Sequence, residues 1–418
     1  MNSSASVRQI APSDGLWTAL HDKARVDGPA EITCGGDCLV REVTFQLDDF
    51  GADLVLSDRF RDFHKGGAAL VEVSGHFPFG AEIGMAQTFR YGARHVRVVS
   101  DLKLRKGSTV RRQVGLGSLF LPGPWRRLYC IPSAQDLAEG KEARWRDLPA
   151  APAVGATLAH WQHLPLALVF ERPNGARLEI GAGSDLWRWE HHFGCKTGTS
   201  SYTVVAEEGG LRVRREPLLT DTELQPQPRV YRLTWHLAWQ PAGAEAAPTS
   251  PEPQLVPVRF TAEGEALIRE AVGAATCPAL LLDLNQWPCL AQRRRAVSPA
   301  ALRRDERAPS PCWESAGVQK ALRRMIRQIA ALGPHGVLTW RGLYPGPCWD
   351  PTHCERQGEP LPHWDLDALL GLCTWGRQQL GPGWQVRVEA PGWEMLPSVA
   401  GLFAPTGFAA PADEAPDA

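Results

Sequence analysis

The sequence predicts a mainly β protein, with a large antiparallel two-sheet β-sandwich over residues 1–240 and a small α/β domain over 257–408. Three observations predict this. Short apolar or alternating runs, separated by turn signals, recur through the first part. The stretch 241–256 is rich in Pro and Ala and has no periodicity, which is typical of a linker. Beyond it, helical periodicity alternates with short strands. A chain of 418 residues is long enough for two such domains.

The first part contains many short strands. They are expected at 31–33, 40–47, 52–56, 68–73, 95–104, 166–171, 177–180, 202–206, 211–215 and 230–239. Asn174-Gly175 predicts a hairpin between two of them, because Asn-Gly readily supplies the positive φ that a tight turn needs. Residues 133–160, rich in Ala, Pro and charge, are expected to form a loop. Many strands joined by hairpins favour a sandwich or barrel, and their number favours a large two-sheet sandwich.

The alternation in 229–239 is regular enough to assign faces. Tyr231, Leu233, Trp235, Leu237 and Trp239 share one face, and Val230, Arg232, Thr234, His236 and Ala238 share the other.

The second part has the pattern of a small α/β domain. Helices are expected at 261–272, 315–332 and 365–380, and strands at 279–284, 336–340 and 384–389. The central helix is strongly amphipathic, with one apolar face formed by Val318, Leu322, Met325, Ile326 and Ile329. Residues 409–418 are too small and polar to pack, so a disordered tail is expected.

Charge and composition limit the classes of partner that the protein can have. There are 45 Lys+Arg against 46 Asp+Glu, so no global field attracts nucleic acid or an anionic membrane. No apolar core of a signal peptide and no membrane-length apolar stretch is visible. Ten Cys without a disulfide framework fit reduced thiols. We therefore expect a cytoplasmic protein without a nucleic-acid or membrane partner; whether it forms a homo-oligomer stays open.

Tryptophan usage is the most unusual feature of the composition, with 16 Trp against 13 Phe and 5 Tyr. An indole offers a flat apolar face and one N–H donor, which suits the C–H-rich face of a sugar ring. The alternative is that these side chains fill the sandwich core.

The densest set of functional side chains lies in residues 184–192, SDLWRWEHH. On a strand, Trp187, Trp189 and His191 would share one face, and Arg188, Glu190 and His192 the other. A carboxylate, an imidazole and a guanidinium together can move a proton on a hydroxyl or on a carbon beside a carboxylate. We expect Glu190 as base, His192 as acid and Arg188 as orienting group. The expected substrate-binding residues are Trp187, Trp189, His191, Arg94, His95 and His76. The alternative is a surface ladder of paired charges.

The long antiparallel pattern, with RPNGARLEIGAGSDLWRWEHH inside it, resembles the large β-sandwich of galactose-mutarotase-like carbohydrate-active proteins. The resemblance covers roughly residues 30–240 and lies in strand pattern and residue types. It implies a concave sheet whose His, Glu and Arg side chains surround a sugar, with His as acid and Glu as base.

A second unusual stretch, 343–364, follows the predicted strand 336–340. Loops of this length are usually functional or disordered, and the carboxyl ends of strands bind ligands in α/β sheets. Cys348, His353, Cys354 and His363 offer soft metal ligands, but their spacing matches no standard zinc pattern. We therefore predict no metal, and a packed loop that docks the small domain onto the sandwich; a metal site in the loop is the weaker alternative.

The sequence thus predicts a carbohydrate-binding or carbohydrate-active protein without a cofactor. If it is an enzyme, proton transfer of an isomerase, epimerase or lyase type is expected. The alternative is a non-catalytic scaffold that uses 343–364 for docking.

Overall fold

The computed structural model describes residues 7–13, 15–26, 28–44, 46–47, 56–65, 67–77, 80–92, 95–104, 110–115, 117–132, 143–161, 165, 167–182, 201–216, 219–224, 231–243, 256–257, 279–283, 316–331, 333, 335–341, 366–389, 396–397 and 404–405. The chain divides into two compact units. The first holds the strands up to residue 240, and the second holds the later strands and both described helices.

Sheet 1 of the first unit is antiparallel, and its eight described strands follow the order β1-β2-β3-β4-β11-β18-β17-β14. The strands are β1 (Val7–Ile10), β2 (Trp17–Asp22), β3 (Pro29–Cys34), β4 (Asp37–Arg41), β11 (Gly117–Pro122), β14 (Thr157–Trp161), β17 (Ser201–Glu207) and β18 (Gly210–Glu216).

Sheet 2 is also antiparallel, and its nine described strands follow the order β13-β12-β15-β16-β20-β9-β8-β7-β6. The strands are β6 (Leu56–Lys65), β7 (Ala68–Phe77), β8 (Gly80–Tyr91), β9 (His95–Leu104), β12 (Arg127–Ile131), β13 (Arg144–Asp147), β15 (Ala167–Glu171), β16 (Arg177–Ala182) and β20 (Tyr231–Gln240). A small third sheet of the first unit joins β5 (Gln46–Leu47), β10 (Val110–Gly115) and β19 (Leu219–Leu224).

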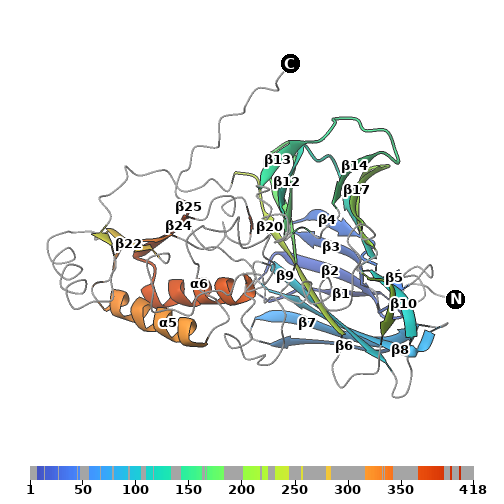
Figure 1. The fold of residues 1–418 in the computed structure, drawn as a ribbon, viewed down its shortest axis with the longest axis horizontal. Helices are drawn as coiled ribbons and strands as arrows, with labels where there is room; N and C mark the ends of the chain where they lie inside the picture. Colours follow the sequence, from blue (N-terminus) through green and yellow to red (C-terminus); the bar gives the residue numbers. More distant parts are fainter. Residues whose placement is uncertain are drawn as a thin grey trace, which may run out of the picture. The chain divides into compact units, whose positions relative to one another are not determined.

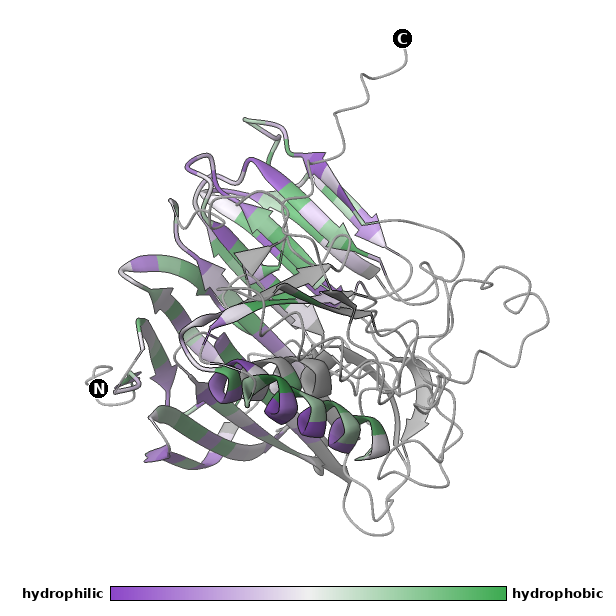
Figure 2. Ribbon diagram, turned by 90° about the vertical axis from the view of Figure 1, so that its left-hand side faces the viewer, coloured by the Kyte–Doolittle hydropathy of each residue, from purple (hydrophilic) through white to green (hydrophobic). Residues whose placement is uncertain are grey.

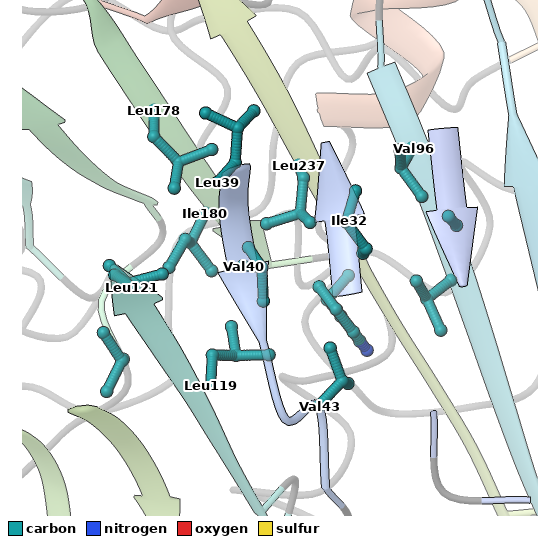
Figure 3. Close-up of a cluster of buried hydrophobic side chains, with 14 of the residues drawn as sticks. Ile32, Leu39, Val40, Val43, Val96, Leu119, Leu121, Leu178, Ile180 and Leu237 are labelled. Carbon is teal, nitrogen blue, oxygen red and sulfur yellow. The ribbon is translucent and has the colours of Figure 1, made fainter. Parts of the chain in front are cut away.

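The two large sheets lie face to face around one hydrophobic core. Strands β12 and β13 of sheet 2 lie opposite β14 and β17 of sheet 1 (Figure 1). Hydrophobic and hydrophilic residues alternate along many of the strands (Figure 2), as expected when one face of each sheet is buried. The core residues labelled in Figure 3 include Ile32, Val40 and Leu119 from sheet 1 and Val96, Ile180 and Leu237 from sheet 2.

The hairpin between β15 and β16 is the turn that the sequence predicts. Gly175 has φ +87°, and its amide donates a hydrogen bond to the Arg172 carbonyl at 2.9 Å. The Asn174 side chain accepts a hydrogen bond from the Ala176 amide at 3.1 Å. This turn sets the register of Val169 opposite Glu179.

The second unit contains a parallel sheet of five described strands in chain order, β21-β22-β23-β24-β25. Its elements are β21 (Val256–Pro257), β22 (Ala279–Asp283), α5 (Ala316–Ala330), β23 (Gly336–Arg341), α6 (Leu366–Leu380), β24 (Trp384–Glu389) and β25 (Ala404–Pro405). The apolar face predicted for α5 is buried as expected. Neither described helix is long and apolar enough to cross a membrane.

The predicted fold class is therefore confirmed. The loop predicted at 133–160 is wrong in part, because β13 and β14 form there. Both strands are short, and β13 is highly charged, so local sequence does not indicate them; pairing with β12 and β17 stabilises them. The long strands β6 and β8 were also not predicted. The boundaries of the predicted domains, the linker 241–256 and the tail 409–418 lie largely outside the described residues and stay predictions.

Candidate functional site

The face of sheet 2 that points away from the sandwich core, here called the outer face, carries an unusual concentration of ionisable residues. On β20, Trp235 and Leu237 belong to the core, so Thr234, His236 and Ala238 lie on the outer face. On β16, Leu178 and Ile180 belong to the core, which leaves Glu179 and Gly181 on the outer face.

Glu179 and His236 form a buried pair on this face. The His236 Nε2 and the Glu179 Oε1 lie 2.8 Å apart. The Glu179 side chain is fully buried, and 8% of the His236 side chain is exposed. When Glu179 is ionised, its carboxylate accepts this hydrogen bond and the imidazole donates it from Nε2.

Gly181 makes room for the imidazole. It stands directly opposite His236 in the β16–β20 ladder. A Cβ atom at residue 181 would lie 1.9 Å from Cε1 and 2.3 Å from Nε2 of His236. Only glycine therefore permits the observed position of the ring, which explains a glycine in the middle of a strand.

The pair lies beside an exposed, basic part of the same face. Arg97 on β9 stands opposite His236, and Arg90 on β8 stands opposite Arg97. Both arginines are exposed, as is His95 on the same strand as Arg97. The outer face thus changes from buried to exposed between β20 and β9, and the Glu179–His236 pair lies at that boundary.

A second buried carboxylate lies nearer the β13 edge of the sheet. Glu171 accepts hydrogen bonds from Arg126 at 2.6 Å, from Arg127 at 2.8 and 3.0 Å and from Arg177 at 3.0 Å. Burial opposes ionisation of the Glu171 carboxyl, but the hydrogen bonds and charges of Arg127 and Arg177 outweigh it and lower its pKa below the usual range. The Glu171 carboxylate and the three arginines that donate to it form a structural ion-pair cluster. We therefore assign Glu171 no chemical step.

Several indole faces are covered by arginine. In the described part of the chain, five tryptophans have a guanidinium over the ring: Trp125, Trp145, Trp235, Trp239 and Trp375. The shortest distance, 4.2 Å, joins Arg127 to the Trp145 ring centre. A ring face that holds an arginine does not hold a sugar, so at these positions the indoles serve cation–π packing.

The site residues predicted from the sequence are only partly described. Trp187, Arg188, Trp189, Glu190, His191, His192 and Arg94 all lie outside the described residues, and their roles stay predictions. His95 lies on the outer face, one strand from the Glu179–His236 pair.

His76 does not join His95. It lies on β7 opposite Gly84, which stands opposite Lys103, eight residues along β9 from His95. Eight residues of strand span about 26 Å. The His76 Nδ1 lies 2.9 Å from the Asp58 carboxylate in an exposed pair.

No three His, Cys, Asp or Glu side chains within the described ranges are arranged to hold a metal ion. Cys348, His353, Cys354 and His363 lie outside those ranges, as does the whole of 343–364, so its docking role stays a prediction.

Sequence reasoning missed Glu179 and Gly181 and gave His236 no role. Two signals were present. The alternation in 229–239 places His236 opposite the apolar face, and Gly181 directly follows the predicted strand 177–180, where a glycine in extended chain can mark close approach by another group. Neither signal shows that Glu179 and His236, which are 57 positions apart in the chain, lie next to one another in the fold.

Comparisons with known proteins place the chain beside carbohydrate-active structures at low similarity. No family model and no curated protein matches the chain. The Slr1438 protein from Synechocystis sp. PCC 6803 is 8% identical, with a TM-score of 0.36, over 57% of this chain and 99% of that one. A putative aldose 1-epimerase from Escherichia coli K12 is 11% identical, with a TM-score of 0.34, over 56% and 98% of the two chains.

A longer alignment is found with a glycoside hydrolase family 97 enzyme from Pseudoalteromonas sp. strain K8, at 8% identity and a TM-score of 0.38, over 93% of this chain and 67% of that one. At these identities and TM-scores, the likenesses assign neither a family nor a function to this chain. Function is therefore argued from the chain's own residues.

Proposed function

We propose that the protein binds a carbohydrate on the outer face of sheet 2 and transfers a proton on it, as an isomerase, epimerase or lyase does. The observation that carries the proposal is the buried Glu179–His236 pair, at 2.8 Å, beside the exposed Arg97.

The chemistry follows from the hydrogen bond. Glu179 holds the imidazole through Nε2, and an ionised Glu179 stabilises the positive charge of a protonated His236. Glu179 is thus a positioning residue, and His236 is the group that exchanges the proton with the sugar. Positioned acid–base groups of this kind contribute about 100- to 10,000-fold in rate.

The carbohydrate class is supported by residue types and by the sandwich. The strand pattern and residues of 30–240 resemble galactose-mutarotase-like proteins, which surround a sugar with His, Glu and Arg on one sheet. The names of the solved structures above belong to the same broad class.

Hydrogen exchange tests the reaction. The protein is incubated with a panel of aldoses, uronates and their oligomers in D2O, and deuterium at carbon is followed by NMR. We expect enzyme-dependent exchange, lowered about 100-fold or more in His236→Gln. His160→Gln, at an exposed position on β14, is the matched control and should exchange normally. Absence of exchange with every sugar of the panel would contradict the proposal.

Two further variants separate the roles. Glu179→Gln changes the group that meets Nε2, so we expect a lower rate and a shifted pH profile in a protein that still binds sugar. Glu190→Gln tests the residue that the sequence predicts as base. Loss of exchange in Glu190→Gln with normal exchange in His236→Gln would move the reacting site to residues 184–192.

A further inference from the structure

The exposed side of α5 in the second unit carries four cations, and the helix has no acidic residue. The four, here called the basic stripe, are Lys320, Arg323, Arg324 and Arg327, and each of these side chains is exposed. Residues three and four positions apart are neighbours on a helix surface, so the four lie on one face. At a rise of 1.5 Å per residue, the stripe extends over about 10 Å.

The basic stripe is not neutralised within the described part of the chain. None of its four side chains forms a hydrogen bond or an ion pair there. Arg323 and Arg327 lie over the Trp375 ring of α6, each 5.3 Å from its centre, but an indole supplies no negative charge. Like charges three or four positions apart destabilise a helix, and every member of the stripe has such a neighbour. A bound polyanion would remove this repulsion.

The surroundings of the stripe favour one class of polyanion. A helix that lies in a membrane surface inserts its apolar face, whereas the apolar face of α5 is buried inside the protein. Single-stranded nucleic acid stacks its bases on aromatic rings, whereas the Trp375 ring already holds two guanidinium groups. Protein interfaces have an apolar centre, whereas this stripe consists of charged side chains. An acidic polysaccharide needs none of these features.

We propose that the basic stripe binds an acidic polysaccharide, a polyuronate, through the carboxylates repeated along its chain. This inference rests on the proposed function, which supplies the carbohydrate class, and adds a separate binding site on the second unit. Three of the four cations are arginines, and the planar fork of a guanidinium matches a carboxylate in bidentate geometry. Each exposed contact is weak, but a polymer that meets several cations at once binds through their sum.

Two polymers with the same backbone and different charge test the inference. Polygalacturonate and its fully methyl-esterified form are labelled with fluorescein, and binding to the full chain is followed by fluorescence anisotropy. We expect the acidic polymer to bind at low salt and the neutral ester to bind at least about 10-fold more weakly. At about 1 M NaCl the difference should largely disappear, because salt screens exposed charges.

Glutamine variants then locate the site. Lys320→Gln, Arg324→Gln and Arg327→Gln should each weaken binding of polygalacturonate about 3-fold, and the three together about 30-fold. Glutamine is a good helix former, so the triple variant should keep α5 folded. Its urea midpoint should equal or exceed that of the unchanged protein, because repulsion within the helix is removed.

The control removes the same charge from exposed positions of the first unit, in the triple variant Arg61→Gln, Lys65→Gln and Arg144→Gln. It should bind polygalacturonate normally. Equal losses in the two triple variants would overturn the inference, as would tighter binding of single-stranded DNA or phosphatidylserine vesicles than of polygalacturonate. Deuterium exchange on sugars without any binding of polygalacturonate would overturn this inference and leave the proposed function intact. Binding of polygalacturonate at the stripe without exchange on any sugar would overturn the proposed reaction alone.

Discussion

The imidazole of His21 and the hydroxyl of Tyr91 lie 2.6 Å apart inside the sandwich, and the hydrogen bond joins strand β2 of sheet 1 to strand β8 of sheet 2. His21 is 2% exposed, and its ring meets Phe89 edge-on, with 4.9 Å between ring centres. Burial lowers the pKa of His21 to about 3 and raises that of Tyr91. The core therefore contains a neutral imidazole that is satisfied by a neutral phenol.

Acid should destabilise the fold through His21. Its pKa is 6.5 in the unfolded chain and about 3 in the folded protein, so the unfolded state binds more protons between these values. The contribution of a neutral His21 to the free energy of unfolding is fully present above pH 6.5. It falls as the pH drops toward 3, by up to about 1.4 kcal/mol per pH unit. Urea unfolding at pH 7, 6 and 5 measures the slope. His21→Gln should be less stable at pH 7 and show a smaller slope. An unchanged slope in this variant would mean that other groups cause the acid sensitivity.

Gly181→Ala should affect both stability and chemistry. The new methyl group would lie within 2 Å of the His236 ring, so the imidazole must move and its bond to Glu179 is lost. Overpacking of this kind costs about 1–3 kcal/mol. The matched control is Gly371→Ala, at an exposed position of α6 where a Cβ meets nothing within 4 Å. That change should stabilise the helix by about 0.5–1 kcal/mol. Normal hydrogen exchange in Gly181→Ala would argue against a role for the ring position.

The Glu171 cluster should contribute strongly to stability. Glu171→Gln leaves three arginine side chains without their carboxylate, and breaking a buried ion pair costs about 3–5 kcal/mol. Arg126 and Arg127 are partly exposed, so we expect the lower end of this range. Glu31→Gln removes a more exposed pair with Arg41 and should cost less than about 1 kcal/mol. Urea midpoints compare the two, and equal losses would contradict the ranking.

Helix α5 should gain stability from a negative charge. Its exposed side carries Lys320, Arg323, Arg324 and Arg327, and the helix contains no acidic residue. Arg324→Glu converts two repulsive pairs, with Lys320 and Arg327, into attractive ones. Each repulsive pair destabilises the helix by about 0.2–0.5 kcal/mol, and each attractive pair stabilises it by a similar amount. We expect a stabilisation of about 1 kcal/mol at low salt that largely disappears at 1 M NaCl. Arg324→Gln should give about half of it, and a gain that persists at high salt would exclude this electrostatic cause.

Local patterns account for what was predicted correctly. The Asn174-Gly175 turn, the two faces of β20 and the buried side of α5 each follow from residues within one turn or one strand. The charged strands β6 and β13 were missed because their sequences have no apolar alternation, and pairing with a neighbouring strand forms them.

The sequence by itself determined that this chain forms a β-sandwich and an α/β unit, and that His236 lies on the side of its strand away from the core. The tertiary structure alone decided that Glu179, Gly181, Arg97 and Arg90 are its neighbours. The physical reason is that side-chain alternation, with a period of two, fixes the face on which a residue lies. Which residues stand opposite it depends on strand order and register, and these are set by packing between segments far apart in the chain.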